Sequence, residues 1–590
     1  MKKLAALVAT LALPCLLPAA AAQAAPPPPF GHPCTPQNGV LFCPTASDTG
    51  RVASFDGVPL DVDVTLPPTG DGPFPALVML HGYGGDKSSF LRATPEGGGG
   101  TGYRYNNTYY AQQGYAVITP SARGFGRSCG RPDSRTAPAC ERGWIHLADQ
   151  RYEVRDTQHL LGLLVDAGVV RPDALGVTGI SYGAIQSHSL ARLRDRIRLP
   201  NGSYARWRSP AGTPLEIAAA WPRWGATDLA YSLTPNGRFL DFGPFSPSQS
   251  RAVGGVPKKS YNDGLYALGN LQGFYAPLGA DPTADITAWK AVSDRGEPFR
   301  SDAVAVLREL STYHSAVGVS GVPAPLLVQN GWTDDLFPAA EALRALRAYR
   351  GLSGTRLSFQ FGDLGHARGS NKPNADRFFN DQGAAFFAAH LKGEGSAPAN
   401  GAVTAFTQTC PAAADAAGPY RAKSWEALHP SRFGLSAPGL QRVTSGGGNP
   451  DTGKAFDKVL SGDACATVPK ERARGTAIVQ RRVRRGVTLL GLPTVRATVR
   501  TTGRGAYLAA RLWDVHRGRQ RLISRGVYRL EDAEKGRVVF QLFGNGWRFR
   551  PGHLVKLELL GSDPDFLRPS NFRFRVGVSN LTVKLPTRKR

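Results

Sequence analysis

A serine between two glycines is the pattern in this sequence that most directly indicates chemistry. Residues 179–183 read Gly-Ile-Ser-Tyr-Gly, after a short apolar run at 175–178 and before a segment of helical character. A strand, a sharp turn and a helix in this order can present a serine hydroxyl at the edge of a sheet. The two glycines remove the Cβ atoms that would collide in so tight a turn. The pattern therefore predicts Ser181 as a nucleophile.

The same pattern occurs a second time, at residues 126–130, which read Gly-Arg-Ser-Cys-Gly. Glycine is abundant, at 69 of 590 residues, so a chance copy of so short a pattern is no surprise. This copy leads into no helical segment, and it contains Cys129, which we expect in a disulfide. Ser128 is therefore the weaker candidate for the nucleophile.

A serine hydroxyl becomes nucleophilic when an imidazole takes its proton and a carboxylate orients that imidazole. In hydrolases built on a parallel sheet, the acid and then the histidine follow the serine, each after a strand. Asp334 comes shortly after a strand predicted at 324–330, and His366 directly follows the strand predicted at 357–361. We therefore predict that Ser181, Asp334 and His366 form a catalytic triad.

Other residues compete for the two supporting roles. Asp335 and Asp363 lie near the same strand ends, and an aspartate at 334 or 335 could instead cap the helix after Pro338. His81 precedes a glycine-rich loop, where a histidine is commonly structural. The remaining competitors lie on helices or in the C-terminal part of the chain: His159, His188, His390, His429, His516 and His553.

Acyl transfer also needs two donors aimed at the oxygen that becomes negative. The backbone N–H of Tyr182, at the start of the helix after the turn, is one predicted donor. The second is expected from the loop at 81–85, His-Gly-Tyr-Gly-Gly, where Tyr83 is the candidate. Tyr83 could donate through its hydroxyl or its backbone N–H, and the competing interpretation is an aromatic side chain that only packs.

Strands alternate with helices around these residues. Helical spacing of apolar residues occurs at 150–165, 339–349 and 375–390, and Asp56-Gly57 indicates a hairpin turn. Short apolar runs predict strands at 76–80, 115–119, 175–178, 217–220, 324–330 and 357–361. This alternation predicts an α/β fold, a doubly wound and mainly parallel sheet of the α/β-hydrolase type, over residues 51–392.

An aromatic-rich insertion at about 222–320 interrupts this alternation, with helices expected near 284–294 and 301–315. We expect it to form a helical cap over the catalytic edge of the sheet. Its aromatic side chains could wall a substrate pocket, although most of them are expected to pack the cap onto the core.

The helical signal ends after a Gly/Ala/Pro-rich linker at 393–402. Short strands separated by turn residues follow, at 487–490, 494–500, 507–512, 538–542, 554–559 and 572–576. They predict a C-terminal all-β jelly-roll sandwich over residues 403–590.

The N-terminus predicts export. Two lysines, an apolar run and Ala22-Gln23-Ala24 indicate a signal peptide at 1–24, followed by a Pro-rich extension at 25–50. Six cysteines remain after cleavage, and neighbours in sequence suggest three disulfides: Cys34–Cys43, Cys129–Cys140 and Cys410–Cys465. No Cys-x-x-Cys occurs, so we expect neither a metal site nor a cofactor. These features predict a secreted or cell-wall-associated protein.

The formal net charge of +26 raises the question of an anionic partner. Arg and Lys are spread along the chain, denser after Lys470, and no recognition helix or RNA-binding signature is present. We therefore expect no nucleic-acid partner. A solvated basic surface that associates loosely with an anionic cell wall or membrane explains the charge better. The sequence carries no sign of a particular oligomeric state.

Several motifs together resemble the X-prolyl dipeptidyl-peptidase family, with its cocaine-esterase and α-amino-acid ester hydrolase relatives. These motifs are Ser181-Tyr182, Gly-Trp-Thr-Asp at 331–334, Gly-His at 365–366, and the strand-start motifs at 490–495 and 549–553. The resemblance covers roughly residues 50–585. It implies a Ser181–Asp334–His366 triad, a tyrosine donor at Tyr83, a helical cap and a jelly roll.

The resemblance implies a secreted serine hydrolase that cleaves a small peptide or ester, with X-Pro dipeptidyl-peptidase activity as the first expectation. The loop at 81–85 is closer to that of general esterases and lipases, and no carboxylate for a peptide's amino terminus is identifiable. A carboxylesterase, amidase or α-amino-acid ester hydrolase is therefore the first alternative. A non-catalytic protein that binds a cell wall or glycan is the alternative from another class.

Overall fold

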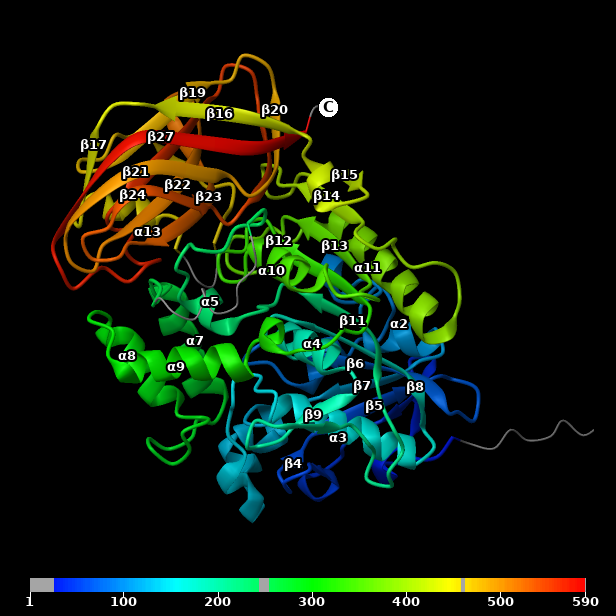
Figure 1. Cartoon of the computed structure of the whole chain (residues 1–590). Coiled ribbons are helices and arrows are strands. Elements are labelled where there is room, and N and C mark those ends of the chain that lie inside the picture. The colour runs from blue at the N-terminus through cyan, green and yellow to red at the C-terminus, as the bar shows by residue number, and fades with distance from the viewer. Residues whose placement is uncertain (1–25, 244–253, 458–461, 589–590) are drawn as a thin grey trace, which may run out of the picture.

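The computed structural model describes residues 26–243, 254–457 and 462–588 (Figure 1). A large mixed sheet covered by helices forms one part of the protein, and two antiparallel sheets formed by the C-terminal residues form the other. The predicted signal peptide lies outside the described residues. The α/β fold with a C-terminal all-β region is therefore confirmed.

Eleven strands form the large sheet, in the order β1-β2-β5-β7-β6-β8-β11-β12-β13-β14-β15. The neighbours from β7 to β14 are parallel, and the pairs at both ends of the sheet are antiparallel. The strands span β1 Thr35–Gln37, β2 Val40–Cys43, β5 Val62–Leu66, β6 Phe74–Leu80, β7 Ala116–Pro120, β8 Val170–Ile180, β11 Ile217–Arg223, β12 Leu326–Gly331, β13 Leu357–Gly362, β14 Val403–Thr407 and β15 Ala417–Ala422.

Helices cover both faces of this sheet because its central strands are apolar on both sides. In β6, Ala76, Val78 and Leu80 face one core, and Leu77 and Met79 face another. The first core is completed by α3 (Glu153–Asp166), α4 (Tyr182–Leu193) and α10 (Ala340–Tyr349), and the second by α2 (Asn107–Gln112) and α11 (Pro373–Phe387). The sheet is doubly wound, as predicted.

The insertion between β11 and β12 forms helices α5 (Leu229–Leu233), α7 (Lys259–Gln272), α8 (Ile286–Arg295) and α9 (Ser301–Tyr313). The helices expected near 284–294 and 301–315 are α8 and α9. A shared apolar core joins the insertion to both other parts, because Leu310 of α9, Ile185 of α4 and Phe566 of the β region belong to one cluster. The cap therefore packs against both the large sheet and the C-terminal region, and Figure 1 shows α7, α8 and α9 beside the sheet and below the sandwich.

The C-terminal region is a sandwich of two antiparallel sheets around one apolar core. One sheet has the order β24-β21-β27-β20-β25, with β16 and β17 paired to β27, and the other has the order β18-β23-β22-β26-β19. The strands span β16 Ser431–Ala437, β17 Gln441–Thr444, β18 Val468–Pro469, β19 Ala477–Arg482, β20 Val487–Gly491, β21 Thr494–Gly503, β22 Tyr507–His516, β23 Arg519–Arg529, β24 Lys535–Gln541, β25 Asn545–Phe549, β26 Leu554–Leu560 and β27 Phe574–Arg588. The predicted β-sandwich is confirmed.

Three details of the fold differ from the sequence pattern. The hairpin around Asp56-Gly57 is short, pairing β3 (Val52–Ala53) with β4 (Pro59–Leu60), while β5 leaves it to pair with β2 and β7. At the other edge, β14 and β15 extend the sheet beyond the linker expected at 393–402. The extension expected at 25–50 also supplies two edge strands, β1 and β2. The domain boundaries themselves stay a prediction.

Each of the three disulfides joins two cysteines that follow one another in the order of cysteines along the chain. Cys34 is bonded to Cys43, Cys129 to Cys140 and Cys410 to Cys465. Within 26–243, 254–457 and 462–588, none of the helices is both long and apolar enough to cross a bilayer.

The disulfides predict a ranking of stabilities. Cys410 and Cys465 are 55 residues apart, and Cys34 and Cys43 are 9 apart. Since a longer closed loop removes more entropy from the unfolded chain, replacing Cys410 and Cys465 by serine should cost about 4 kcal/mol and replacing Cys34 and Cys43 about 3 kcal/mol. Guanidinium unfolding of the two double variants measures both costs. A smaller loss for the Cys410–Cys465 pair would contradict the prediction.

Candidate active site

Strand β8 ends one residue before Ser181, and α4 begins one residue after it. Ser181 has φ 54° and ψ −112°, a conformation that non-glycine residues rarely adopt. Its N–H donates to Arg223 O at 3.0 Å, and its carbonyl accepts from the N–H groups of Ala184 and Ile185. The strained backbone is therefore held from both sides, with the side chain at the carboxyl edge of the sheet.

The flanking glycines are required by close packing. A Cβ at Gly183 would collide with the carbonyl oxygen of Leu80, and one at Gly179 would lie 2.6 Å from the carbonyl carbon of Gly183. Since both obstacles are backbone atoms, no side-chain rotation could relieve them. The turn predicted from residues 179–183 is present, and its glycines are there for the predicted steric reason.

Three side chains from separate strand ends form a continuous hydrogen-bonded chain. His366 Nε2 lies 2.7 Å from Ser181 Oγ, and His366 Nδ1 lies 2.7 Å from Asp334 Oδ2. The other oxygen of Asp334 accepts from the N–H groups of Leu336 and Phe337, at 2.9 and 2.8 Å. The structure thus brings together the three predicted triad residues, in the arrangement that proton transfer from a serine requires.

The competing aspartates have other partners. Asp335 is ion-paired with Arg368 and Arg525, and Asp363 accepts hydrogen bonds from the Thr333 hydroxyl and the Ser370 N–H. Burial raises the pKa of Asp363. These contacts give both carboxylates a structural role.

Three of the competing histidines have contacts or burial that give them a structural role. His81 accepts a hydrogen bond from the Ala122 N–H at 2.9 Å and packs edge-on against Phe125. His188 is buried in α4, where desolvation lowers its pKa to about 3 and keeps the ring neutral. His390 packs against Phe386 in the segment that follows α11. Only His366 among these contacts Ser181.

Ser128, in the second copy of the motif, is fully buried away from the triad. Its Oγ donates to the Ser121 carbonyl at 2.8 Å and accepts from the Asp61 N–H at 2.8 Å. Cys129 is bonded to Cys140. The second motif therefore forms a disulfide-linked turn in which the hydroxyl links backbone segments.

Tyr182 is the first residue of α4, so its N–H lacks an intrahelical acceptor and is free to face the site. Its hydroxyl donates to Glu153 Oε1 at 2.8 Å and accepts from the Ala148 N–H at 2.9 Å. Glu153 also accepts from the N–H groups of His146 and Asp149. Burial raises the pKa of Glu153 to about 8. Glu153 could not be predicted from the sequence, because nothing in its local pattern indicates a contact with Tyr182, which is 29 residues away.

The loop after β6 lies against the serine. A Cβ at Gly82 would be 3.7 Å from the Cβ of Ser181. The Tyr83 hydroxyl lies 2.7 Å from the hydroxyl of Tyr275 in the cap, and Tyr275 in turn donates to the Tyr266 carbonyl. Since Tyr275 uses its proton on that carbonyl, the Tyr83 hydroxyl must donate to Tyr275. The Tyr83 hydroxyl is therefore already engaged with the cap.

An apolar cavity of about 160 Å³ opens beside Ser181. Its wall consists of Tyr182 and Ile185 from α4, Leu336 and Phe337 from the loop after β12, and mostly aliphatic and aromatic residues of α7, α8 and α9. Among the described residues that line it, Lys290 is the one charged side chain, and its ammonium is paired with Asp263 and Asp294. The cap therefore builds the cavity, as expected from the sequence.

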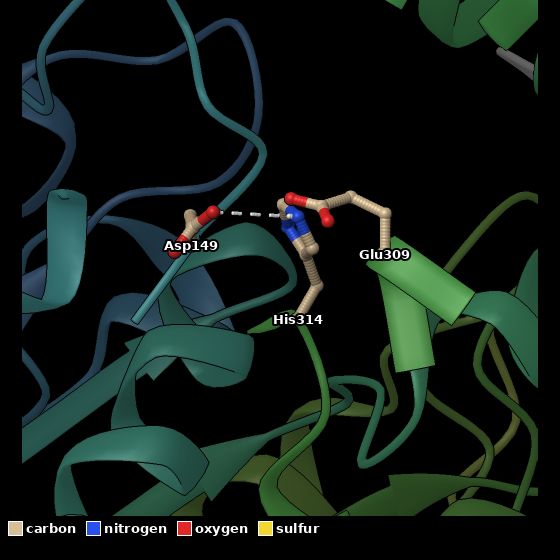
Figure 2. Close-up of side chains that lie close together, drawn as sticks. All are labelled: Asp149, Glu309 and His314. Carbon is tan, nitrogen blue, oxygen red and sulfur yellow. Dashed lines mark ion pairs between the residues drawn. The ribbon is translucent and has the colours of Figure 1, made fainter. Parts of the chain in front are cut away.

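A cluster of possible metal ligands lies behind this wall. Figure 2 shows the imidazole of His314 beside the carboxylates of Asp149 and Glu309. His314 Nδ1 donates to the Leu147 carbonyl at 2.9 Å, and Nε2 lies 3.6 Å from Asp149 Oδ2. The guanidinium of Arg151 bonds both carboxylates. Because a fixed cation already neutralises the pair, we interpret the cluster as an ion-pair group that joins α9 to the loop before α3.

Residues 56–196 match the family model for X-Pro dipeptidyl-peptidase, the S15 family. The match contains Tyr83, Ser181 and Tyr182, and it confirms the resemblance inferred from the sequence. A search of curated proteins finds no significant match.

Solved structures share the whole architecture at low sequence identity. A CocE/NonD family hydrolase from Staphylococcus aureus is 12% identical, with a TM-score of 0.56 over 93% of this chain and 94% of that one. An aminopeptidase from a marine sediment Thaumarchaeota archaeon is 12% identical, with a TM-score of 0.58 over 94% and 98%. An α-amino acid ester hydrolase is 14% identical, with a TM-score of 0.55 over 95% and 98%.

At these identities the structural likenesses establish the fold, and the family match adds the class of reaction. The protein is a hydrolase of the serine type with an α/β-hydrolase fold. The matched family model is that of an X-Pro dipeptidyl-peptidase, and one of the similar structures is an α-amino acid ester hydrolase.

Gly365 offers a test of how tightly this site is packed. It has φ +94°, and a Cβ there would collide with Asp334 Oδ2. Gly365→Ala should displace the carboxylate from His366 and lower kcat by about 100-fold. Gly393→Ala is the matched control, because Gly393 also has positive φ but a Cβ there would meet nothing within 4 Å. Equal activity of the two variants in steady-state assays would refute the proposed packing constraint.

Proposed function

We propose that the protein hydrolyses uncharged esters or amides of apolar acids through a covalent acyl-enzyme on Ser181. One observation carries the proposal: the hydrogen-bonded chain from Ser181 through His366 to Asp334 borders an apolar cavity. A hydroxyl, an imidazole and a carboxylate in this order make a serine nucleophilic at neutral pH.

The hydrogen bonds suggest a role for each side chain. His366 Nδ1–H donates to Asp334, which fixes the imidazole tautomer and leaves Nε2 to take the proton of Ser181 Oγ as the C–O bond to the substrate forms. His366 then returns the proton to the leaving oxygen or nitrogen. A water molecule, deprotonated by the same nitrogen, attacks the acyl-enzyme and releases the acid.

The developing negative oxygen needs fixed donors. We assign this role to the backbone N–H groups of Tyr182 and Tyr83. The first is at the free end of α4, and the second is in the loop that approaches Ser181 at Gly82. Glu153 acts indirectly, because its carboxyl group holds the Tyr182 side chain and so helps to fix the start of α4.

The cavity supports an apolar, uncharged acyl group. A peptide substrate cut near its free amino terminus carries an ammonium group, which needs an anionic or carbonyl partner when it leaves water. The described lining residues include no aspartate or glutamate, and the one cation among them is Lys290. Transfer of an aliphatic or aromatic acyl group into this cavity would be favourable by about 25 cal/mol for each Å² of apolar surface buried.

X-Pro dipeptidyl-peptidase activity is the second candidate function. The family match over residues 56–196 favours it, and the archaeal aminopeptidase with the same architecture is consistent with it. The apolar cavity would accept a proline ring. Because the described residues that line the cavity include no anionic partner for the ammonium group, we rank this activity after ester hydrolysis.

Export is proposed from the signal peptide predicted at 1–24. The three disulfides support it, because such bonds persist in oxidising compartments. The net charge of +26 supports loose association with an anionic surface after export.

Substitution of the triad residues tests the mechanism. Ser181→Ala and His366→Ala should each lower kcat for a short acyl ester by at least about 10⁴-fold, because each removes an atom of the proton-transfer chain. Asp334→Asn should lower kcat by about the same factor. Ser128→Ala is the matched control, since that serine also lies in a Gly-x-Ser-x-Gly motif, and it should retain activity. Activity retained in Ser181→Ala would place the nucleophile elsewhere.

A substrate panel separates the two candidate functions. We expect p-nitrophenyl esters of uncharged acids to be hydrolysed with higher kcat/KM than an X-Pro p-nitroanilide with a free amino terminus. An N-acetylated X-Pro anilide is the control, because it removes only the positive charge. If the free peptide were hydrolysed fastest and acetylation abolished the reaction, the dipeptidyl-peptidase function would replace the proposed one.

A further inference from the structure

An arginine of the C-terminal sandwich reaches the loops that carry the catalytic acid and base. Arg525 lies on β23, and its side chain is 1% exposed. Its Nε is 3.3 Å from Asp335 Oδ2, and its Nη1 is 2.7 Å from Asp457 Oδ1. The guanidinium packs over the ring of Phe566. A side chain from outside the large sheet is thus buried against Asp335, the residue that follows the catalytic acid.

Asp335 connects the two catalytic loops. It directly follows Asp334, and its carboxylate accepts a bidentate pair of hydrogen bonds from Arg368, at 2.7 and 3.1 Å. Arg368 lies two residues after His366, and its own N–H donates to the His366 carbonyl at 2.8 Å. The Asp335–Arg368 ion pair therefore joins the loop that carries the acid to the loop that carries the base. Arg525 contacts this ion pair through Asp335.

The position of Asp334 depends on the backbone around it. Its Oδ1 accepts from the N–H groups of residues 336 and 337, so its carboxylate moves with the segment that contains Asp335. Beyond the strands, Asp334 and Ala367 form an isolated bridge, and Ala367 has φ +59°. This strained connection persists only because surrounding contacts hold it. The Asp335–Arg368 ion pair is one of these contacts, and the hydrogen bond from the Thr333 hydroxyl to Asp363 is another.

The charges make Arg525 necessary for the arrangement. Burial alone would raise the pKa of Asp335, but Arg368 and Arg525 together lower it below its ordinary value. Both guanidinium groups are almost completely buried, as is Asp457. Removing Arg525 would leave Asp457 without its ion-pair partner and Asp335 with Arg368 alone as its ion-pair partner, in a buried region.

We propose that Arg525 is a positioning residue for the reaction, which holds Asp334 and His366 in register through Asp335 and Arg368. The C-terminal sandwich is then part of the active site. This inference rests on the proposed function, since the triad must act for its geometry to affect a rate.

The test compares two buried arginines of the sandwich. Arg525→Gln should lower kcat for a p-nitrophenyl ester by about 10- to 100-fold with KM within threefold, because the cavity is untouched while the proton-transfer chain is misplaced. Arg511→Gln is the matched control. Arg511 is 2% exposed and ion-paired with Asp563, so its loss destabilises a buried pair without contact with Asp335. It should keep the wild-type kcat below its own Tm.

A double-mutant cycle checks the route of the effect. Asp335→Asn should lower kcat by a similar factor, and Arg525→Gln with Asp335→Asn together should be no worse than the poorer single variant. If Arg525→Gln does not fold, Arg525→Lys takes its place, with at least a threefold loss in kcat expected because lysine cannot bridge Asp335 and Asp457 in the same geometry.

Wild-type kcat in the Arg525 variant, an equal loss in Arg511→Gln, or multiplicative losses in the double variant would each overturn the inference. An inactive wild-type protein would instead contradict the proposed function, so the two failures are distinguishable.

Discussion

The hydrogen bond between His366 and Ser181 is the contact on which the rest of the structure depends. It joins residues 185 positions apart at a distance of 2.7 Å. Such a contact requires both strands to end at the same edge of one sheet, which parallel pairing from β6 to β13 provides. It also requires a serine held in a strained turn, which the close approach of Gly183 to Leu80 permits. The order of the strands, the turn at Ser181 and the loop that carries His366 together make this hydrogen bond possible.

The cap and the sandwich determine what reaches that bond and how firmly it is held. The cap helices supply most of a cavity whose described lining residues are nearly all apolar. The hydrogen bond between the hydroxyls of Tyr83 and Tyr275 links the loop beside Ser181 to the segment that follows α7 in the cap. Arg525 of the sandwich contacts the loop that carries the catalytic acid, through Asp335. Both the cap and the sandwich therefore contribute residues around the triad.

Much of the fold was predictable because the central strands are short, apolar and separated by helices of clear periodicity. The chain order of Ser181, Asp334 and His366 could be predicted for the same reason, since each follows a strand. The competing Ser128 could be set aside because a cysteine and no helix accompany it. These arguments need only local pattern and the rule that parallel strands share an edge.

The parts that could not be predicted depend on contacts between distant segments. Strand β23 contains four arginines in eleven residues, so its polar sequence hid a strand whose Arg525 is buried by ion pairs. Helix α7 was not predicted, and Tyr261 and Gly269 are its only buried residues. Glu153 and the Tyr83 hydroxyl have partners more than 25 residues away, at Tyr182 and Tyr275. No local signal specifies such partners.

Mapping a covalent adduct would show whether Ser181 is the nucleophile. The wild-type protein would be treated with a fluorophosphonate, digested, and its modified peptide identified by mass spectrometry. We expect a single phosphonylated residue, Ser181, and no label when the protein is unfolded before treatment. Modification at Ser128 or another serine in the folded protein, with Ser181 unmodified, would contradict it.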